Sequence, residues 1–472
     1  MNAIGHFAEL KALAARAPEL PGALVAALRT RFGERLSLAR SVREHHGTDI
    51  SSYPVTPPAA VVFVESTDDV VAVVRACAEH RVPVIPFGTG TSVEGHVLAT
   101  RGGVCADLSR MNRVLEVNAA DLDVRVEAGV TRKALNAHVK DTGLFFPIDP
   151  GADASLGGMA STRASGTNAV RYGTMKDNVL AATVVLADGE VIRVGSRARK
   201  SAAGYDLARL FVGAEGTLGI ITELALRLHP IPEAMSAAAC AFPTVRAAVD
   251  SVIEAIQCAI PVARVELLDT LTVSAVNRHS KLGLTEAPTL WFEFHGTPRG
   301  VEEQATQMQE IAGAHGGLDF VWSTRPEERT RLWQARHDAY FACLALKPGS
   351  RMIATDVCVP ISRLADCIAD TEVDIAASSL PIPLFGHVGD GNFHLMILVD
   401  PNRDDEIGEA WELNARLVRR ALAMGGTCTG EHGIGLGKRE FLVEEFGPAV
   451  KVMRSIKDAL DPAGIMNPGK VL

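Results

Sequence analysis

The sequence has no closely spaced pair of cysteines. Its eight cysteines are scattered along 472 residues, and no C-x-x-C pair occurs. Zinc and iron–sulfur sites made only of cysteine usually contain such pairs, so the sequence excludes them, and it has no haem-attachment motif. Scattered thiols are typical of buried cysteines in a reducing compartment. We therefore expect a cytoplasmic protein, or a protein of the mitochondrial matrix if the source is eukaryotic.

Long apolar runs and an excess of positive charge are also missing. No stretch approaches the roughly 18 consecutive apolar residues of a membrane-spanning helix, so we expect no transmembrane segment and at most a peripheral association with a membrane. The first residues lack the compact apolar core of a secretory signal. The 47 basic residues and 56 acidic residues give a net charge of −9. Nucleic-acid-binding proteins usually display a basic surface, so we expect no nucleic-acid partner.

The common nucleotide fingerprints fail on inspection. The segment HGIGLGKRE resembles a P-loop, but His432 stands where the first glycine is required, and Arg439 follows the lysine in place of Ser or Thr. The segment GAEGTLG, residues 213–219, does not match G-x-G-x-x-G. The sequence therefore predicts neither a P-loop ATP site nor a Rossmann nicotinamide site.

Four parts are predicted along the chain, whose length is roughly twice what one hydrophobic core usually supports. They are a helical arm (1–50), a first α/β region (51–230), a second α+β region (231–425) and a C-terminal segment rich in Gly and Pro (426–472). Pro230 and Pro232 mark the main boundary. We expect the C-terminal segment to return to a site formed by the other parts.

Periodicity gives the outline of the two regions. Residues 60–87 read strand, helix, strand, which predicts a β-α-β unit, and residues 179–194 predict a hairpin around Asp188-Gly189. In the second region, 240–256 and 357–371 both read strand, Pro, turn, amphipathic helix. This similarity favours an α+β domain with helices on one face of an antiparallel sheet. Strand-Pro-helix turns are, however, common enough to occur twice without an internal repeat.

Two segments rich in small residues look suited to a large ligand. PFGTGTSVEG (86–95) directly follows a predicted strand, and its glycines allow backbone N–H groups to approach a pyrophosphate closely. The segment 149–173 is dense in Gly, Ala, Ser and Thr, which seldom build a core over such a length. The apolar residues Leu156, Met159 and Val170 interrupt it, which argues against a flexible linker. We therefore predict that this segment contacts a large rigid ligand.

These segments carry a family resemblance. PFGTGTSVEGH, DPGADASLGGMASTRASGTNAVRYGTMKDNV, FVGAEGTLGIITE, TDVCVPISRL, GHVGDGNFH, TGEHGIGLGK and DPAGIMNPGK together resemble the vanillyl-alcohol-oxidase-type FAD flavoproteins. Within them the chain is most similar to the FAD-dependent D-2-hydroxyacid dehydrogenases, especially those of the cytochrome- or quinone-linked D-lactate type. The resemblance covers nearly the whole chain from about residue 50. It implies an α+β fold in which 51–230 form a two-subdomain FAD-binding domain, 231–425 form an α+β (ferredoxin-like) cap, and 426–472 return to the FAD.

The resemblance also implies which residues hold FAD. The pyrophosphate loop matches at Gly88, Thr89, Gly90, Thr91 and Ser92. The second wrapping segment matches at Pro150, Gly151, Gly157, Gly158, Ser161, Thr162, Gly166, Tyr172 and Gly173. The adenosine side matches at Glu215, Gly216, Ile220 and Ile221, and the tail matches at Asn467. Relatives that bond FAD covalently carry a His where this chain has Thr91, so the resemblance implies non-covalent FAD.

Two histidines flank the turn in GHVGDGNFH. If Gly389 to Asn392 form the turn, His387 faces His394 across a hairpin, with their Cβ atoms ~5 Å apart. Two such imidazoles can bind one divalent ion, with zinc favoured and manganese or iron admitted if oxygen ligands join. A pair of packed or solvated histidines is the plainer alternative. Glu431 is the best candidate for a third ligand, and the family's metal-binding residues match these three positions.

The residues around Glu431 and along the helix before Lys347 suggest the chemistry. His432 suits a general base, because the pKa of an ordinary imidazole lies near neutral pH and the oxidation removes a hydroxyl proton. Arg336, within a helix predicted over 327–347, matches the family's carboxylate-binding Arg, although spacing alone suggests only an exposed charge. Lys347 is a weaker second candidate. Tyr340 and Met396 are bulky and uncharged, which favours D-lactate or another short or apolar D-2-hydroxy acid.

We therefore expect oxidation of such an acid to the 2-oxo acid, with hydride transfer to flavin and electrons leaving to an external acceptor. That acceptor is a quinone, a cytochrome or an electron-transfer flavoprotein. The alternatives are a D-2-hydroxyglutarate or glycolate dehydrogenase on the same scaffold, an oxygen-using oxidase, and a flavin electron-transfer subunit with a structural metal. A homodimer is a further expectation.

Overall fold

The computed structural model describes residues 19–472, which divide into two units. The first unit comprises the described chain up to Ser165, together with Gly173–Pro230 and Glu431–Leu472. The second comprises Gly166–Tyr172 and Ile231–Gly430. Residues 1–18 of the predicted arm lie outside the described residues. Within the described part no helix is long and apolar enough to cross a membrane.

A mostly parallel sheet opens the first unit. Its strand order is β1-β2-β4-β3, and β2, β4 and β3 run parallel. The strands are β1 (Leu36–Ser37), β2 (Ala60–Phe63), β3 (Val84–Phe87) and β4 (Val104–Asp107). Helix α4 (Thr67–Glu79) connects β2 to β3 and begins where the Ser66 hydroxyl accepts a hydrogen bond from the Asp69 backbone N–H. The predicted β-α-β unit is confirmed.

The start of the described chain packs on this sheet. Helix α2 (Gly22–Phe32) buries Leu24, Leu28 and Phe32 in the same apolar cluster as the strands. A 3₁₀ turn η1 (Gly33–Arg35) and helix α3 (Arg40–His46) complete this segment. Residues 22–46 therefore form part of the first unit's core instead of projecting from it.

A five-stranded antiparallel sheet forms the rest of the first unit. Its order is β5-β6-β10-β8-β9. The strands are β5 (Val114–Asn118), β6 (Asp123–Glu127), β8 (Val179–Val185), β9 (Val191–Gly195) and β10 (Ile220–Arg227). Strands β8 and β9 pair antiparallel across the predicted Asp188-Gly189 turn, which confirms that hairpin. The other elements are η2 (Ala119–Asp121), α5 (Arg132–Val139), η3 (Lys140–Thr142), β7 (Leu144–Phe145), α6 (Leu156–Thr162), α8 (Met175–Asn178), α9 (Leu207–Phe211) and β11 (His229–Pro230).

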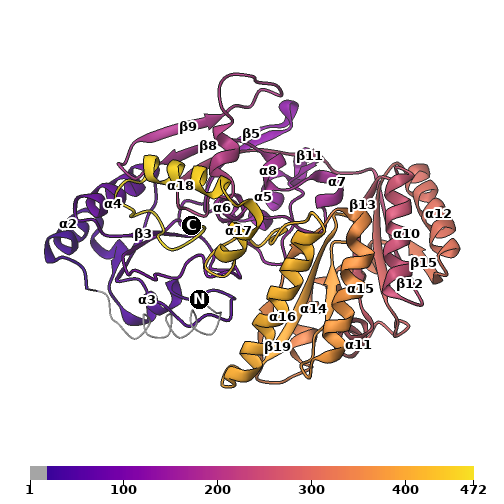
Figure 1. The fold of residues 1–472 in the computed structure, drawn as a ribbon. Coiled ribbons are helices and arrows are strands. Elements are labelled where there is room, and N and C mark those ends of the chain that lie inside the picture. Colours follow the sequence, from indigo (N-terminus) through magenta and orange to yellow (C-terminus); the bar gives the residue numbers. More distant parts are fainter. Residues whose placement is uncertain (1–18) are drawn as a thin grey trace. The chain divides into compact units, whose positions relative to one another are not determined.

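The C-terminal segment returns to the first unit. Helices α17 (Arg439–Phe446) and α18 (Ala449–Leu460), yellow in Figure 1, lie among N-terminal elements of that unit. Met466 forms a parallel bridge with Val84 of β3, and the Asn467 backbone N–H donates to the Val84 carbonyl oxygen at 2.9 Å. The last residues of the chain therefore extend the edge of the sheet that carries the glycine-rich loop.

The second unit is built on one large sheet. Its order is β15-β12-β14-β13-β18-β19-β16, with β17 also pairing with β19. The strands are β12 (Ala234–Ala241), β13 (Val262–Leu268), β14 (Thr289–Gly296), β15 (Leu318–Ser323), β16 (Arg351–Ala354), β17 (Val357–Cys358), β18 (Leu384–Gly386) and β19 (Asn392–Val399). All pairings in it are antiparallel.

Helices cover both faces of this sheet, so the prediction of a single covered face is wrong. The helices are α7 (Ala169–Tyr172), α10 (Val245–Gln257), α11 (Thr270–Ser280), α12 (Pro298–Ala314), α13 (Pro326–His337), α14 (Ala339–Leu344), α15 (Ile361–Ala377) and α16 (Asp404–Ala423). Seven consecutive residues of β14 are buried, which requires packing on both sides. The helices of the two similar segments, α10 and α15, pack against each other. The helix predicted over 327–347 is divided at Asp338 into α13 and α14.

Candidate functional site

The two segments predicted to bind FAD meet in the first unit at the end of β3. A Cβ atom added to Gly88 would lie 2.2 Å from the Ser155 hydroxyl oxygen, and one added to Gly158 would lie 3.0 Å from it. Gly90 has φ +65°, a backbone conformation that favours glycine. The loop 88–92 therefore lies directly against Ser155 at the start of α6, so closely that Gly88 leaves no room for a side chain.

Unpaired buried polar atoms fit a ligand at this place. Among residues 19–472, the Ser155 hydroxyl and the Asn467 side-chain oxygen are buried and have no hydrogen-bond partner. Burying such atoms unpaired is costly, so a bound molecule with donor and acceptor groups would stabilise them. Asn467 is held in place because its side-chain amide donates to the carbonyl oxygens of Glu215 and His96. The residues present fit the predicted FAD.

Some predicted FAD contacts have other partners for their side chains. The hydroxyls of Ser161 and Thr162 donate to the carbonyl oxygens of Gly157 and Gly158, one helical turn earlier. Ile220 and Ile221 are buried core residues of β10. Pro150 and Gly151 lie in a loop, and nothing lies within 4 Å of a Cβ built on Gly151 among the described residues. Gly173 has φ +75°, and Gly216 has φ +72° and would place a Cβ against Pro86.

Gly166 and Tyr172 belong to the second unit. The Tyr172 hydroxyl lies 2.7 Å from Nδ1 of His295, whose Nε2 lies 2.7 Å from Glu293. The Asn168 side chain accepts a hydrogen bond from Arg264 Nε at 2.9 Å. This short segment of the predicted wrapping stretch is therefore docked on β13 and β14.

The two histidines of GHVGDGNFH lie on one face of the β18–β19 hairpin, but the predicted register is wrong. Phe385 is paired with His394, which places His387 two residues further along, opposite Asn392. Side chains alternate faces with a period of two, so this shift keeps both imidazoles on the same face. Their ring centroids lie 5.5 Å apart, and their ligand atoms lie within 4.8 Å of each other.

Both imidazoles are held by hydrogen bonds at Nδ1. His394 Nδ1 lies 3.0 Å from the Thr355 carbonyl oxygen, which can only accept. His387 Nδ1 is hydrogen-bonded to the Glu266 carboxylate. A proton on Nδ1 leaves the lone pair on Nε2, which is the tautomer that a metal ion requires. The donor set thus fits a divalent cation.

Glu266 is the centre of this group. It is fully buried on β13, and its second oxygen accepts a hydrogen bond from Arg336 Nε at 2.8 Å. Burial acts to raise the pKa of Glu266, but His387 and Arg336 outweigh it, so the pKa is lowered and the carboxyl group is ionised. The Glu266 carboxylate therefore orients both His387, a candidate metal ligand, and Arg336.

The two predicted carboxylate-binding cations differ in their surroundings. Arg336 on α13 is mostly buried, and its guanidinium lies 4.7 Å from the centre of the Phe385 ring. Its exposed fraction is only 11%, so it is not the exposed charge that spacing suggests. Lys347 instead pairs with Glu406 at the start of α16, and this pairing lowers the pKa of Glu406.

His432 and Glu431 lie in the first unit, directly after the boundary at Gly430. His432 Nε2 lies 4.0 Å from Glu431, and its Nδ1 lies 4.0 Å from Glu94. The side chains of Glu431 and His432 are 15% and 19% exposed. The predicted base thus has a carboxylate 4.0 Å from each of its ring nitrogens.

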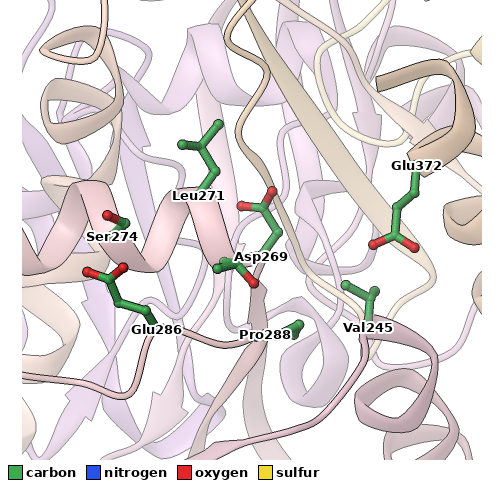
Figure 2. A pocket seen from close by; sticks show the side chains of 8 residues that line it. Val245, Asp269, Leu271, Ser274, Glu286, Pro288 and Glu372 are labelled. Atoms are coloured by element: carbon green, nitrogen blue, oxygen red, sulfur yellow. The ribbon is translucent and has the colours of Figure 1, made fainter. Parts of the chain in front are cut away.

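A cavity of about 470 Å³ in the second unit is lined by none of the predicted site residues. Figure 2 shows that it carries the carboxylates Asp269, Glu286 and Glu372. Burial raises the pKa of both Asp269 and Glu372. This acidic cavity takes no part in the site described above.

Sequence reasoning missed Glu266 and Asp356. Asp356 is fully buried, accepts hydrogen bonds from Asn392 and Thr429, and lies 3.8 Å from His394 Nδ1. A signal for Glu266 was present, because the apolar strand VARVELL carries Arg264 and Glu266 at alternating positions. Charged residues are seldom fully buried unless they are paired.

Two family models match the chain. Residues 58–195 match the FAD binding domain, and residues 231–471 match the C-terminal domain of FAD linked oxidases. A protein of Danio rerio named "Probable D-lactate dehydrogenase, mitochondrial" is 54% identical over 443 residues, which cover 93% of this chain and 89% of that one. A protein of Arabidopsis thaliana named "D-lactate dehydrogenase (cytochrome), mitochondrial" is 47% identical over 457 residues, covering 96% and 81%.

A solved structure shows the same fold. The structure titled as p-cresol methylhydroxylase with substrate bound superimposes with a TM-score of 0.80 at 19% identity, covering 95% of this chain and 96% of that one. The predicted α+β fold of the vanillyl-alcohol-oxidase type is confirmed, and so is the FAD-dependent character of the family. The cytoplasmic location stays a prediction, since both relatives are named as mitochondrial. The chain belongs to the family of FAD-linked oxidases.

Proposed function

We propose that the chain oxidises D-lactate to the corresponding 2-oxo acid and passes the electrons to an external acceptor. The observation that carries this proposal is the buried Glu266 carboxylate, which orients His387 and Arg336 together. An imidazole whose Nε2 is left for a metal ion, beside a guanidinium, suits a substrate whose hydroxyl and carboxylate groups stand on neighbouring carbons. The two chain-wide relatives named as D-lactate dehydrogenases support D-lactate as that substrate.

Arg336 holds the substrate carboxylate in this proposal. Its Nε is engaged by Glu266, which leaves the two Nη groups to form a bidentate pair with a carboxylate. Stacking on Phe385 and burial restrict the guanidinium to few orientations. Lys347 is the less favoured alternative, because Glu406 already engages its ammonium group.

His432 acts as the general base. It accepts the proton of the substrate hydroxyl while the hydride leaves C2 of the substrate, so the carbon is oxidised by two electrons and becomes a carbonyl. Bound FAD supplies the site that accepts this hydride. Its two ring nitrogens each lie 4.0 Å from a carboxylate, one of Glu94 and one of Glu431.

A divalent metal, zinc or manganese, is proposed on His387, His394 and Glu431. Two imidazoles with hydrogen-bonded Nδ1 atoms support this assignment. A Cβ atom on Gly430 would lie 2.2 Å from the Asn392 side chain, so the chain passes the end of the hairpin one peptide bond before Glu431. The metal would lower the pKa of the substrate hydroxyl as a Lewis acid.

FAD is proposed to be bound non-covalently in the first unit. Loop 88–92, the start of α6, the backbone around Gly216 and the side chain of Asn467 would hold it. The unpaired Ser155 hydroxyl and Asn467 oxygen support this assignment. The hydroxyls of Ser161 and Thr162 are engaged within α6, and the side chains of Ile220 and Ile221 are buried in the core.

An apolar cluster beside Arg336 supports a short substrate. Met396 is buried in one cluster with Trp291 and Trp333, and Tyr340 packs against it. None of these side chains can neutralise a second carboxylate. The acceptor is proposed to be a cytochrome, as the name of the Arabidopsis relative suggests, with a quinone or an electron-transfer flavoprotein as alternatives.

Substrate profiling tests the proposal. The FAD-loaded protein is assayed anaerobically with an artificial electron acceptor and with D-lactate, L-lactate, glycolate and D-2-hydroxyglutarate in turn. We expect the highest kcat/KM with D-lactate and none with L-lactate. A higher kcat/KM with glycolate or D-2-hydroxyglutarate would transfer the proposal to that substrate. Hydrogen peroxide formation in air at the same rate would indicate an oxidase.

A further inference from the structure

A buried ion pair in the first unit has no role in the proposed reaction. Glu215 Oε2 lies 3.2 Å from His96 Nε2, and the two side chains are only 2% and 7% exposed. Burial acts to raise the pKa of Glu215, but His96 and two backbone N–H groups outweigh it, so the pKa is lowered and the carboxylate is ionised. Such a pair must be well satisfied to persist, because desolvation of both charges is costly.

The two backbone N–H groups belong to the loop that follows the predicted base. The Ile434 N–H donates to Glu215 Oε1 at 2.7 Å, and the Gly435 N–H donates to Oε2 at 2.8 Å. His432 precedes Ile434 by two residues. The carboxylate thus fixes the backbone of the same short loop through both of its oxygens.

Glycines in this loop allow the close approach. A Cβ atom on Gly433 would lie 2.7 Å from Glu215 Oε1 and 2.9 Å from His96 Nε2. A Cβ atom on Gly435 would lie 2.1 Å from the Glu94 carbonyl oxygen. Glu94 itself accepts a hydrogen bond from the Leu436 backbone N–H at 2.8 Å. The loop therefore packs directly on the segment that carries His96.

We propose that Glu215, supported by His96, is a positioning residue that fixes the loop carrying Glu431 and His432. The role of His432 as the base rests on the proposed function, whereas the anchoring of the loop does not. This assignment differs from the adenosine-side contact that the family resemblance implies for Glu215, because the carboxylate is fully engaged by protein groups. The residue acts on the reaction only through the loop.

The ionised form of the side chain is essential to this role. A carboxylate accepts hydrogen bonds from the two N–H groups and also carries the charge that faces His96 at 3.2 Å. Replacement by Gln keeps the size of the side chain, but it provides one acceptor oxygen and turns an NH₂ group toward a donor. Glu215→Gln therefore releases one end of the loop without creating a cavity.

Amide hydrogen exchange measures the anchoring directly. In the FAD-loaded protein, Glu215→Gln is expected to speed exchange at Ile434 and Gly435 about tenfold or more, since hydrogen bonds to a charged group are lost. Glu223→Gln is the matched control, because Glu223 lies on β10, is 28% exposed and pairs with Arg125. Unchanged exchange at Ile434 and Gly435 would overturn the proposal.

Kinetics separate positioning from a purely structural role. With saturating FAD and D-lactate as the probe, Glu215→Gln is expected to lower kcat about tenfold or more, because small displacements of a catalytic group cost up to ~100-fold. KM for D-lactate and the affinity for FAD should stay within about threefold of the wild-type values, since Arg336 is unchanged and the Glu215 carbonyl oxygen that holds Asn467 belongs to the main chain. Full recovery of kcat at high FAD concentration would overturn the proposal in favour of a cofactor contact.

A second variant covers the case in which Glu215→Gln fails to fold. Gly433→Ala leaves the Glu215–His96 pair chemically intact but pushes the loop away from it, so the same loss of amide protection and of kcat is expected. Gly464→Ala is its control, because Gly464 also has positive φ, +63°, and no described atom lies within 4 Å of an added Cβ. Equal behaviour of the two alanine variants would overturn the proposal. If the wild-type protein does not oxidise D-lactate, the exchange result still tests the anchoring by itself.

Discussion

At the scale of single residues, Glu266 holds two candidate site residues, His387 and Arg336, through its two carboxylate oxygens. Replacement of Glu266 by Gln removes the charge that fixes His387 and weakens the hydrogen bond to Arg336. We expect zinc or manganese affinity to fall about 10–100-fold, the usual effect of losing a partner of a metal-binding histidine. KM for D-lactate should rise as well. Competition with a chelating dye measures the metal affinity.

Glu302→Gln is the control for this change, because Glu302 is an exposed carboxylate on α12 of the same unit. Metal affinity equal to wild type in Glu266→Gln would contradict the role given to Glu266. A change in metal affinity without any change in KM for D-lactate would contradict substrate binding by Arg336, but it would still support metal binding by His387.

The buried side chain of Lys470 should make the free energy of unfolding depend on pH. Lys470 is buried near the C-terminus, and burial lowers its pKa from 10.5 to about 7. Between these two values the unfolded chain binds a proton that the folded chain does not, so the free energy of unfolding should rise with pH, by up to about 1.4 kcal/mol per pH unit. Below pH 7 both states are protonated and the dependence ends.

Lys470→Met should remove this rise. Denaturant unfolding of the first unit at pH 7, 8 and 9 provides the measurement, and Lys200→Met, at an exposed position, should keep the wild-type slope. The same slope in Lys470→Met as in wild type would show that Lys470 is charged in the folded state.

The presence of Thr at position 91 predicts that FAD is bound without a covalent bond. Thr91 occupies the position at which covalent relatives carry His, and its hydroxyl lies 3.1 Å from that of Thr89 in the loop. Acid precipitation of the FAD-loaded protein should therefore leave all of the flavin in the supernatant. Flavin that stays with the pellet after denaturation would show a covalent bond from another residue.

Residue types and motifs identified the candidates, but they could not supply their partners. His387, His394 and Arg336 were found from motifs, and the structure brings the three together around Glu266. Glu266 itself lies 70 residues before Arg336 and 121 residues before His387. A single sequence gives no measure of such long-range proximity, so only the charge within an apolar strand hinted at it.

At the scale of secondary-structure elements, the β18–β19 hairpin controls where the histidines lie. Its turn contains Gly391, which has φ +79°, and a Cβ atom there would lie 2.2 Å from the Val359 carbonyl oxygen. Gly391→Ala should therefore destabilise the second unit by more than the ~1–2 kcal/mol that left-handed backbone costs an L-residue. It should also weaken metal binding, because the turn must shift.

Gly349→Ala separates the two effects. Gly349 has φ +82°, yet no described atom lies within 4 Å of an added Cβ, so only the backbone term applies. We expect this variant to lose stability while its metal affinity stays at the wild-type value. Denaturant unfolding and metal titration of both variants provide the comparison. Equal metal affinity in the two variants would show that the turn does not set the position of the histidines.

The hairpin also shows why register is hard to predict. Counting from an assumed Gly389–Asn392 turn placed His387 opposite His394, whereas the observed pairing is Phe385 with His394. The Asn392 backbone N–H instead donates to the His387 carbonyl oxygen, so the turn lies one residue earlier. The face was predicted correctly because it depends only on the period of two.

At the scale of the whole molecule, local patterns gave the strands and helices but not all of their assignments to units. The β-α-β unit, the β8–β9 hairpin and the return of the C-terminal segment agree with the pattern of the sequence. The segment Gly166–Tyr172 does not, because it lies within a stretch of small residues but docks on β13 through the Asn168–Arg264 hydrogen bond. Nothing local distinguishes it from its neighbours.

The most direct test of the proposed function is the visible spectrum of the FAD-loaded protein without oxygen. D-lactate should bleach the flavin band and L-lactate should not. Removal of metal by a chelator should abolish the bleaching, and zinc or manganese should restore it. A flavin that stays oxidised with D-lactate but bleaches with another D-2-hydroxy acid would contradict the substrate. A flavin that no D-2-hydroxy acid reduces would contradict the central claim and favour an electron-transfer subunit.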